Sequence, residues 1–73
     1  MIAEYLYRTP VEEKSIKLGN EFYTYRAMKH MSLRRTAKLL NTDPVIIQLA
    51  EQGLLPYERV QVLLRDFKKL TLR

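Results

Sequence analysis

The segment from Ser32 to Pro56 constrains this chain most, because it predicts two short helices joined by a tight turn. The hydroxyl of Ser32 can cap the first helix. The next residues place an apolar or small side chain at the spacing of one helix face: Leu33, Thr36, Ala37 and Leu40. Asn41 tolerates the left-handed conformation that ends a helix. Asp43-Pro44 then supplies a capping carboxylate and a preset φ, so a second helix is predicted to start there.

The rest of this segment predicts how the two helices end and cross. Gly53 can end the second helix, and Pro56 opens a third. The small side chain of Ala37 suits two helices that cross closely. These features predict a helix-turn-helix unit. The third helix has the clearest amphipathic pattern in the chain: Tyr57, Val60, Leu63, Leu64, Phe67 and Leu70.

The residues before this unit admit two interpretations. Two β-prone runs flank Gly19-Asn20, a pair that accepts the positive φ angles of a hairpin turn, and the hairpin is the favoured prediction. The alternative is a helix from Pro10 to Leu18 that Gly19 ends. Residues 1–8 predict a short strand, since their isoleucine and tyrosines suit a pleated surface.

We therefore expect an α+β fold, with a small N-terminal β-hairpin or sheet packed on a three-helix helix-turn-helix unit. Residues 1–73 would form one domain, with the strands in 1–27 and the helices in 32–70. The core is predicted from Leu33, Ala37, Leu40, Ile47, Leu49, Leu54, Val60, Leu64 and Phe67, closed by Ile16, Leu18 and Tyr23.

The composition excludes several classes of protein. The 73 residues contain no cysteine, so a disulfide framework and thiolate metal sites are excluded. Glu4 interrupts the only early apolar run, and no run approaches the roughly 20 apolar residues of a membrane span. His30 is the only histidine, and no acid or nucleophile stands at the spacing of a catalytic or metal site. We expect a cytoplasmic protein that is not an enzyme and needs no cofactor, metal or membrane.

The charge points to a polyanionic partner or an acidic protein surface. The formal net charge is +5. Basic residues gather before and on the first helix of the pair and at the end of the third helix. Five of them are predicted to lie near nucleic acid: Arg34, Arg35, Lys38, Lys68 and Lys69. The alternative is a solvated basic face.

The second helix of the pair has an unusual surface for a DNA reader. Asp43 and Glu51 give it a net charge of −2, and no Lys or Arg occurs between residues 39 and 58. Phosphate contacts dominate DNA affinity, so this helix would be repelled. Six residues are predicted to bind protein instead: Tyr5, Tyr7, Phe22, Tyr23, Val45 and Ile46. The alternative places the aromatic residues in the core and the second helix under the hairpin.

The segment SLRRTAKLLNTDPVIIQLAEQGLLP resembles the helix-turn-helix of excisionase-like and MerR-like regulators. The matching residues cover about one third of the chain: Ser32, Leu33, Ala37, Leu40, Ile47, Gly53, Leu54, Leu55 and Pro56. Two turn positions depart from that pattern, with Asn41 for glycine and Thr42 for an apolar residue. The resemblance implies a sequence-specific DNA binder in which the basic residues of the first helix contact phosphates and Gln48 contacts adenine.

The whole chain also resembles small phage-encoded factors that bind host RNA polymerase, block initiation and promote antitermination, in its length, its basic charge and its altered helix-turn-helix. This resemblance implies docking on a polymerase subunit near the RNA exit channel, in the cytoplasm of a bacterial host. The leading prediction is a non-enzymatic transcription regulator that binds polymerase. The alternatives are an excisionase-type DNA binder and an interaction module with no nucleic-acid partner.

Overall fold

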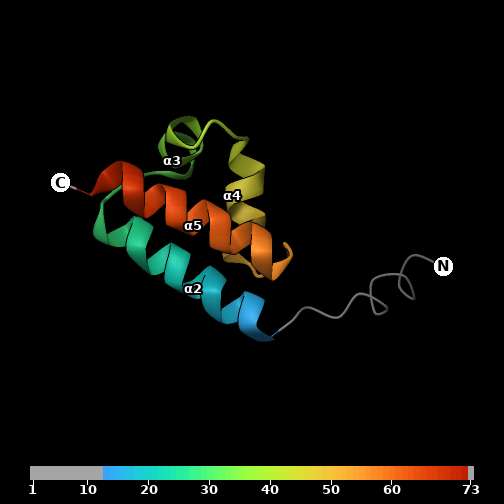
Figure 1. Cartoon of the computed structure of the whole chain (residues 1–73). Coiled ribbons are helices and arrows are strands. Elements are labelled where there is room, and N and C mark those ends of the chain that lie inside the picture. Colours follow the sequence, from blue (N-terminus) through green and yellow to red (C-terminus); the bar gives the residue numbers. More distant parts are fainter. Residues whose placement is uncertain (1–12, 73) are drawn as a thin grey trace.

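The computed structural model describes residues 13–72, and this part of the chain is all-helical (Figure 1). Its helices are α2 (Glu13–Met28), α3 (Leu33–Leu39), α4 (Pro44–Glu51) and α5 (Tyr57–Thr71). No strand occurs between residues 13 and 72, so the predicted α+β class is wrong. The strand predicted over residues 1–8 lies outside the described residues.

Helix α2 runs through Gly19, where the sequence favours a hairpin turn. A Cβ atom built at Gly19 would overlap the carbonyl oxygen of Ala50 and would lie 2.9 Å from that of Glu51. The missing side chain therefore lets the backbones of α2 and α4 approach closely. The hairpin prediction is wrong because this packing outweighs the local β-propensity. The alternative prediction of a helix is right for residues 13–18, but Gly19 does not end it.

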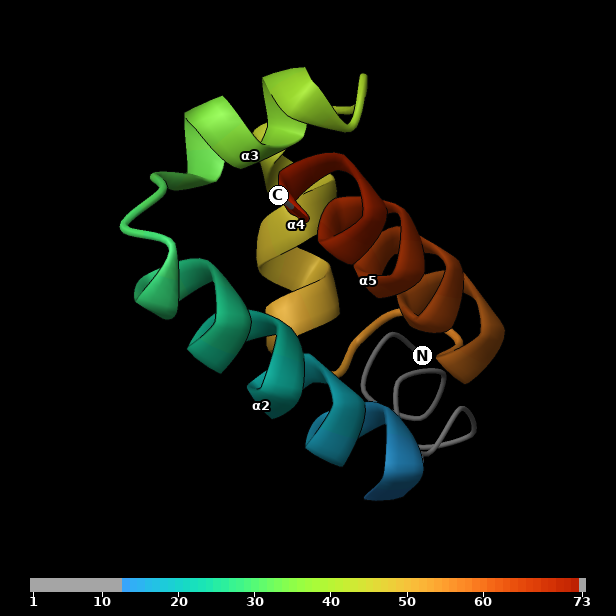
Figure 2. The same cartoon turned by 60° about the vertical axis from the view of Figure 1, so that its left-hand side comes forward.

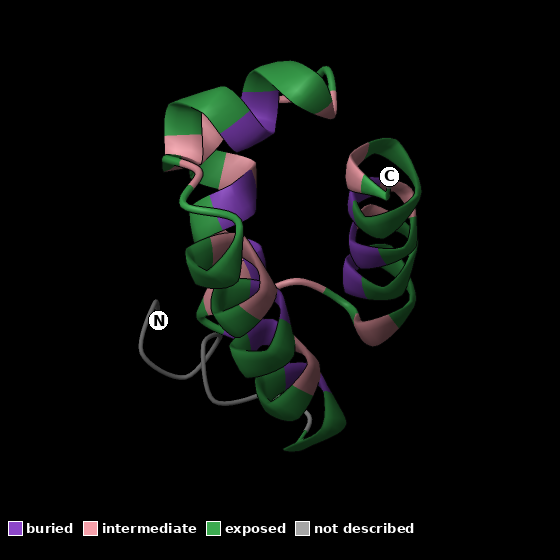
Figure 3. Ribbon diagram, turned by 90° about the vertical axis from the view of Figure 1, so that its left-hand side faces the viewer, coloured by how far each residue is buried: buried purple, intermediate pink, exposed green. Residues whose placement is uncertain are grey.

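The core lies where the inner faces of the helices meet (Figure 3). Its buried cluster comprises Phe22, Ala37, Ile47, Leu64 and Phe67, and Val60 is also fully buried. The rings of Phe22 and Phe67 stack with centroids 5.3 Å apart, which joins α2 to α5. Leu18, Leu33 and Leu40 are partly buried against this cluster, as predicted.

Three residues predicted to be in the core are instead exposed. They are Ile16, Tyr23 and Leu54. Ile16 and Tyr23 were placed inside by the hairpin register, and on the helix they fall beside the buried stripe rather than within it. Leu54 lies in the loop that follows α4. The prediction for Ile16 and Tyr23 is wrong because the face of α2 was assigned with the period of a strand.

Helices α2 and α5 lie side by side and run in the same direction (Figures 1 and 2). At the contacts between the two helices, the residue numbers increase in the same direction along both. The contacting pairs are Lys14 with Tyr57, Phe22 with Phe67, and Tyr25 with Thr71. Both C-terminal ends therefore reach the same end of the molecule. Helix α3 lies at that end as well (Figure 2).

Candidate functional site

The helix-turn-helix forms with the caps and turn that the sequence predicts. Ser32 Oγ accepts the backbone N–H three residues on at 3.1 Å, and Asp43 Oδ1 accepts the N–H two residues on at 2.8 Å. Asn41 has a φ of 56° in the turn, and Gly53 has a φ of 76° after α4. Local side-chain chemistry thus fixes where α3 and α4 begin and where each one stops.

Glu51 is held by an ion pair with Arg26 of α2. Arg26 Nε and Nη2 donate to the two carboxylate oxygens at 2.5 and 3.0 Å, and Nη1 donates to the Met31 carbonyl at 2.9 Å. The hydrogen bonds that Arg26 donates to the Glu51 carboxylate raise the pKa of Arg26 above its ordinary value. The side chains of the pair are only 14% and 10% exposed. Glu51 therefore neutralises a neighbour and does not present a free negative charge on α4, which corrects the predicted net charge of −2 for this helix.

The outer face of α4 presents one apolar side chain, one amide and no cation, beside the exposed carboxylate of its cap, Asp43. Val45 is 57% exposed, and Gln48 is exposed. Ile46 and Leu49 are half-buried. No part of residues 13–72 forms a hairpin over this face, so the predicted exposure of Val45 is confirmed and that of Ile46 is partial. A face of this kind can contact a protein, and it offers DNA one amide and no cation.

The four aromatic residues predicted to bind protein differ in whether the structure describes them and in how far they are exposed. Tyr5 and Tyr7 lie outside the described residues. Phe22 is fully buried against Phe67, so it has no surface for a partner, and the prediction is wrong for this residue. Tyr23 is 54% exposed, with the guanidinium carbon of Arg26 5.4 Å from its ring centroid.

The basic residues that are distant in sequence gather at one end of the molecule. Arg34, Arg35 and Lys38 are exposed on α3, and Lys68 and Lys69 are exposed at the end of α5. Two lysines, one in the turn after α2 and one on α5, lie near the ring of Tyr25, with Lys29 Nζ 5.4 Å and Lys68 Nζ 5.8 Å from its centroid. Lys68 also pairs with Glu21 at 3.2 Å. The parallel course of α2 and α5 produces this concentration of positive charge.

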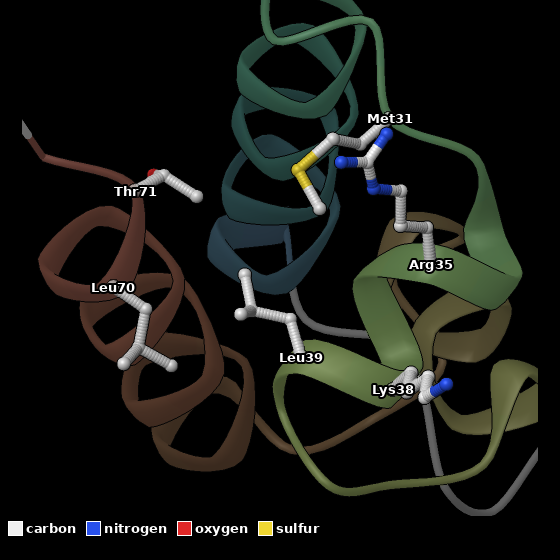
Figure 4. Close-up of a pocket in the computed structure, with 6 residues that line it drawn as sticks. All are labelled: Met31, Arg35, Lys38, Leu39, Leu70 and Thr71. Atoms are coloured by element: carbon white, nitrogen blue, oxygen red, sulfur yellow. The ribbon is translucent and has the colours of Figure 1, made fainter.

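An open groove of about 530 Å³ lies at this basic end, between α3 and the end of α5 (Figure 4). It is lined by Met31, Arg35, Lys38, Leu39, Leu70 and Thr71. Leu39 reaches from α3 toward the space between the helices, and Arg35 lies beside Met31 (Figure 4). The sequence singled out Arg35 and Lys38 as basic residues but did not predict the groove. The available signal was Leu39, an apolar residue outside the stripe that α3 buries.

Within residues 13–72, no three His, Asp or Glu side chains are grouped so that they could hold a metal ion. None of the described helices has the length and apolar character needed to cross a membrane. Comparisons with models of protein families, with curated proteins and with solved structures found no match to this chain. A function must therefore be argued from the surface chemistry of this chain and from the resemblances of its sequence.

Proposed function

We propose that this protein is a small non-enzymatic transcription regulator that binds bacterial RNA polymerase, inhibits initiation and promotes antitermination. One observation carries the protein-binding part of the proposal: α4 exposes the apolar Val45 and has no cation, although it takes the place of the reading helix in a helix-turn-helix. The choice of polymerase as the partner is supported by the resemblance of the whole chain to small phage-encoded factors.

The surface of α4 argues against this helix as the main reader of DNA. DNA affinity comes largely from cations that contact phosphates. Helix α4 offers none, and the guanidinium of Arg26 beside it is already bound to Glu51. The exposed Val45 is therefore better suited to a protein surface, where an apolar side chain gains affinity as it is buried.

The basic residues have a separate role in this proposal. Arg34, Arg35 and Lys38 on α3, with Lys68 and Lys69 on α5, would lie near nucleic acid while the protein is docked on polymerase. Charges of this kind raise the local affinity for phosphates without reading a sequence.

The proposal is tested by capture of purified bacterial RNA polymerase, and then of its isolated subunits, on the immobilised full chain. We expect binding at micromolar concentration, together with reduced initiation and increased readthrough of a terminator in a purified transcription assay. Val45→Glu should weaken capture at least about tenfold, because it places a charge on the apolar face. Val62→Glu is the matched control, since Val62 is a similarly exposed valine on α5. Absence of capture at micromolar concentration would contradict the proposal.

A second candidate is direct DNA binding of the excisionase type. The observation in its favour is that Gln48 is exposed on α4 while the cations of α3 are exposed on the preceding helix. Gel-shift assays over a range of salt concentrations separate the two functions. A steep salt dependence with a preference for one sequence would support DNA binding, whereas no shift of duplex DNA would favour the polymerase regulator.

A further inference from the structure

The groove between α3 and the end of α5 combines an apolar lining with a cationic edge. Leu39 and Leu70 are 38% and 51% exposed, and Met31 is half-buried beside them. Arg35 and Lys38 are the only charged residues of the lining, and both are basic. The side chains of the groove therefore favour a ligand that carries apolar groups and negative charge together.

The surroundings of the groove extend this positive field. Lys29 Nζ and Lys68 Nζ lie 5.4 and 5.8 Å from the ring centroid of Tyr25, whose hydroxyl is hydrogen-bonded to Thr71 of the lining, and Lys69 is exposed on the last turn of α5. Glu21 offsets one of these charges through its 3.2 Å contact with Lys68. The lining residues themselves include no carboxylate that would oppose an acidic ligand.

We propose that this groove binds an acidic amphipathic helix of a partner protein. Apolar residues at every third or fourth position of that helix would pack on Met31, Leu39 and Leu70, and its flanking carboxylates would pair with Arg35 and Lys38. The inference goes beyond the proposed function, because the groove lies on α3 and α5 rather than on the exposed face of α4, and it does not depend on polymerase as the partner. It assigns Arg35 and Lys38 to the partner helix and leaves Arg34, Lys68 and Lys69, which lie outside the lining, for the nucleic acid of the proposed function.

The lining favours a peptide over a nucleic acid. Single-stranded nucleic acids are held by cations together with aromatic side chains on which bases stack. The groove has the cations, but its other lining residues are aliphatic or small, with a methionine that adapts to differently shaped apolar partners. A nucleic acid would engage Arg35 and Lys38 and leave the two leucines uncovered.

The test uses the full chain and a fluorescent synthetic peptide of about 18 residues, a length at which a helix can form. The peptide has leucine at every third or fourth position and glutamate at most of the others. We expect it to bind with a Kd on the order of 10 μM and to shift the amide NMR signals of Leu39, Leu70 and Thr71. A peptide with lysine in place of every glutamate should not bind.

Two variants and one control locate the binding. Leu39→Glu should weaken binding at least about tenfold. The double charge reversal Arg35→Glu with Lys38→Glu should do the same without altering the apolar lining, and it keeps the test valid if Leu39→Glu does not fold. Val45→Glu adds the same charge on α4 and should leave peptide binding unchanged.

Several results would overturn the inference. Equal binding of the lysine peptide would show that charge plays no part, and signal changes confined to α4 would place the peptide elsewhere. Displacement of the peptide by a single-stranded RNA that shifts the same signals would assign the groove to nucleic acid. Changes in those signals on dilution without any peptide would assign it to a second copy of this chain. A failure of polymerase capture would contradict only the proposed function.

Discussion

Replacement of Gly19 by alanine tests the close crossing of α2 and α4 directly. Alanine is favoured over glycine within a helix by about 0.8–1.0 kcal/mol, so without the crossing this substitution would stabilise the protein. The new methyl group would instead overlap the carbonyl oxygen of Ala50 and lie 2.9 Å from that of Glu51. These atoms belong to the backbone of α4, so relief requires the two helices to move apart.

The free energy lost when α2 and α4 move apart exceeds the free energy gained from the higher helix propensity of alanine. Overpacking a core costs typically about 1–3 kcal/mol, and here it also disturbs the contact of Phe22 with Ile47 and the pair of Arg26 with Glu51. Because the overlapping atoms are backbone, we expect a cost at the upper end of that range, about 3 kcal/mol, and after the gain of about 1 kcal/mol in propensity Gly19→Ala should lower the free energy of unfolding by about 2 kcal/mol net. In a domain of this size, that corresponds to a fall in Tm of about 8–16 °C.

The measurement is thermal and urea unfolding followed by far-UV circular dichroism. Asn20→Ala is the matched control, since Asn20 is the exposed neighbour of Gly19 in the same helix. This control gains helix propensity without a new contact and should stabilise by roughly 0.5 kcal/mol. If Gly19→Ala raised Tm as much as Asn20→Ala, the close crossing of α2 and α4 would be refuted.

Five further variants test the core, the cap of α4 and the ion pair, each by urea unfolding. Thr36→Val should stabilise by about 1 kcal/mol, because the buried Thr36 hydroxyl has no partner among the described residues; a loss of stability would reveal a hydrogen bond to that hydroxyl. Asp43→Ala should cost about 1 kcal/mol through loss of the cap on α4, and an unchanged midpoint would argue against that cap. Glu51→Ala should lower the free energy of unfolding by about 2 kcal/mol, because it leaves the Arg26 guanidinium without its partner. Arg26→Met combined with Glu51→Leu should recover most of that loss, and a double variant no more stable than Glu51→Ala would show that the unpaired charge is not the cause. Phe22→Ala should cost about 3–5 kcal/mol, enough to unfold much of the protein, and a cooperative transition near that of the parent would show that Phe22 is not central to the core.

The sequence predicted the helix-turn-helix and α5 well because their limits depend on local chemistry. The capping oxygens of Ser32 and Asp43, the left-handed turn residue Asn41 and Gly53 after α4 act within a few positions of themselves. The apolar stripe of α5 likewise repeats with the period of a helix, so the buried face of this helix could be predicted from the sequence.

Helix α2 could not be predicted in the same way. Its residues include isoleucine, threonine and aromatics that favour strands, and its Gly19-Asn20 pair is typical of hairpins. What makes this segment helical is its packing on Ala50 and on Phe67, which are far along the chain. The helix and strand propensities of a few neighbouring residues give no information about contacts with residues far along the chain.

The candidate site was predictable in composition but not in arrangement. The apolar, cation-free character of α4 and the exposure of Val45 followed from the sequence. The pairing of Glu51 with Arg26 joins residues 25 positions apart, and it changed the charge that α4 presents. The groove needed the relative placement of Leu39 and Leu70, which only the packing of α3 beside α5 supplies.

The parallel seam of α2 and α5 has a consequence for how the chain acquires its fold. Tyr25 and Thr71 meet across 46 positions, so closing the core means closing a long loop, which slows folding relative to local helix formation. Helices α3 and α4 have 7 and 8 residues, below the length at which an isolated helix is stable in water. We therefore expect α3 and α4 to reach their native packing during synthesis only after α5 has left the ribosome. Products that stop before Phe67 would reach the cell as unfolded chains, open to proteases.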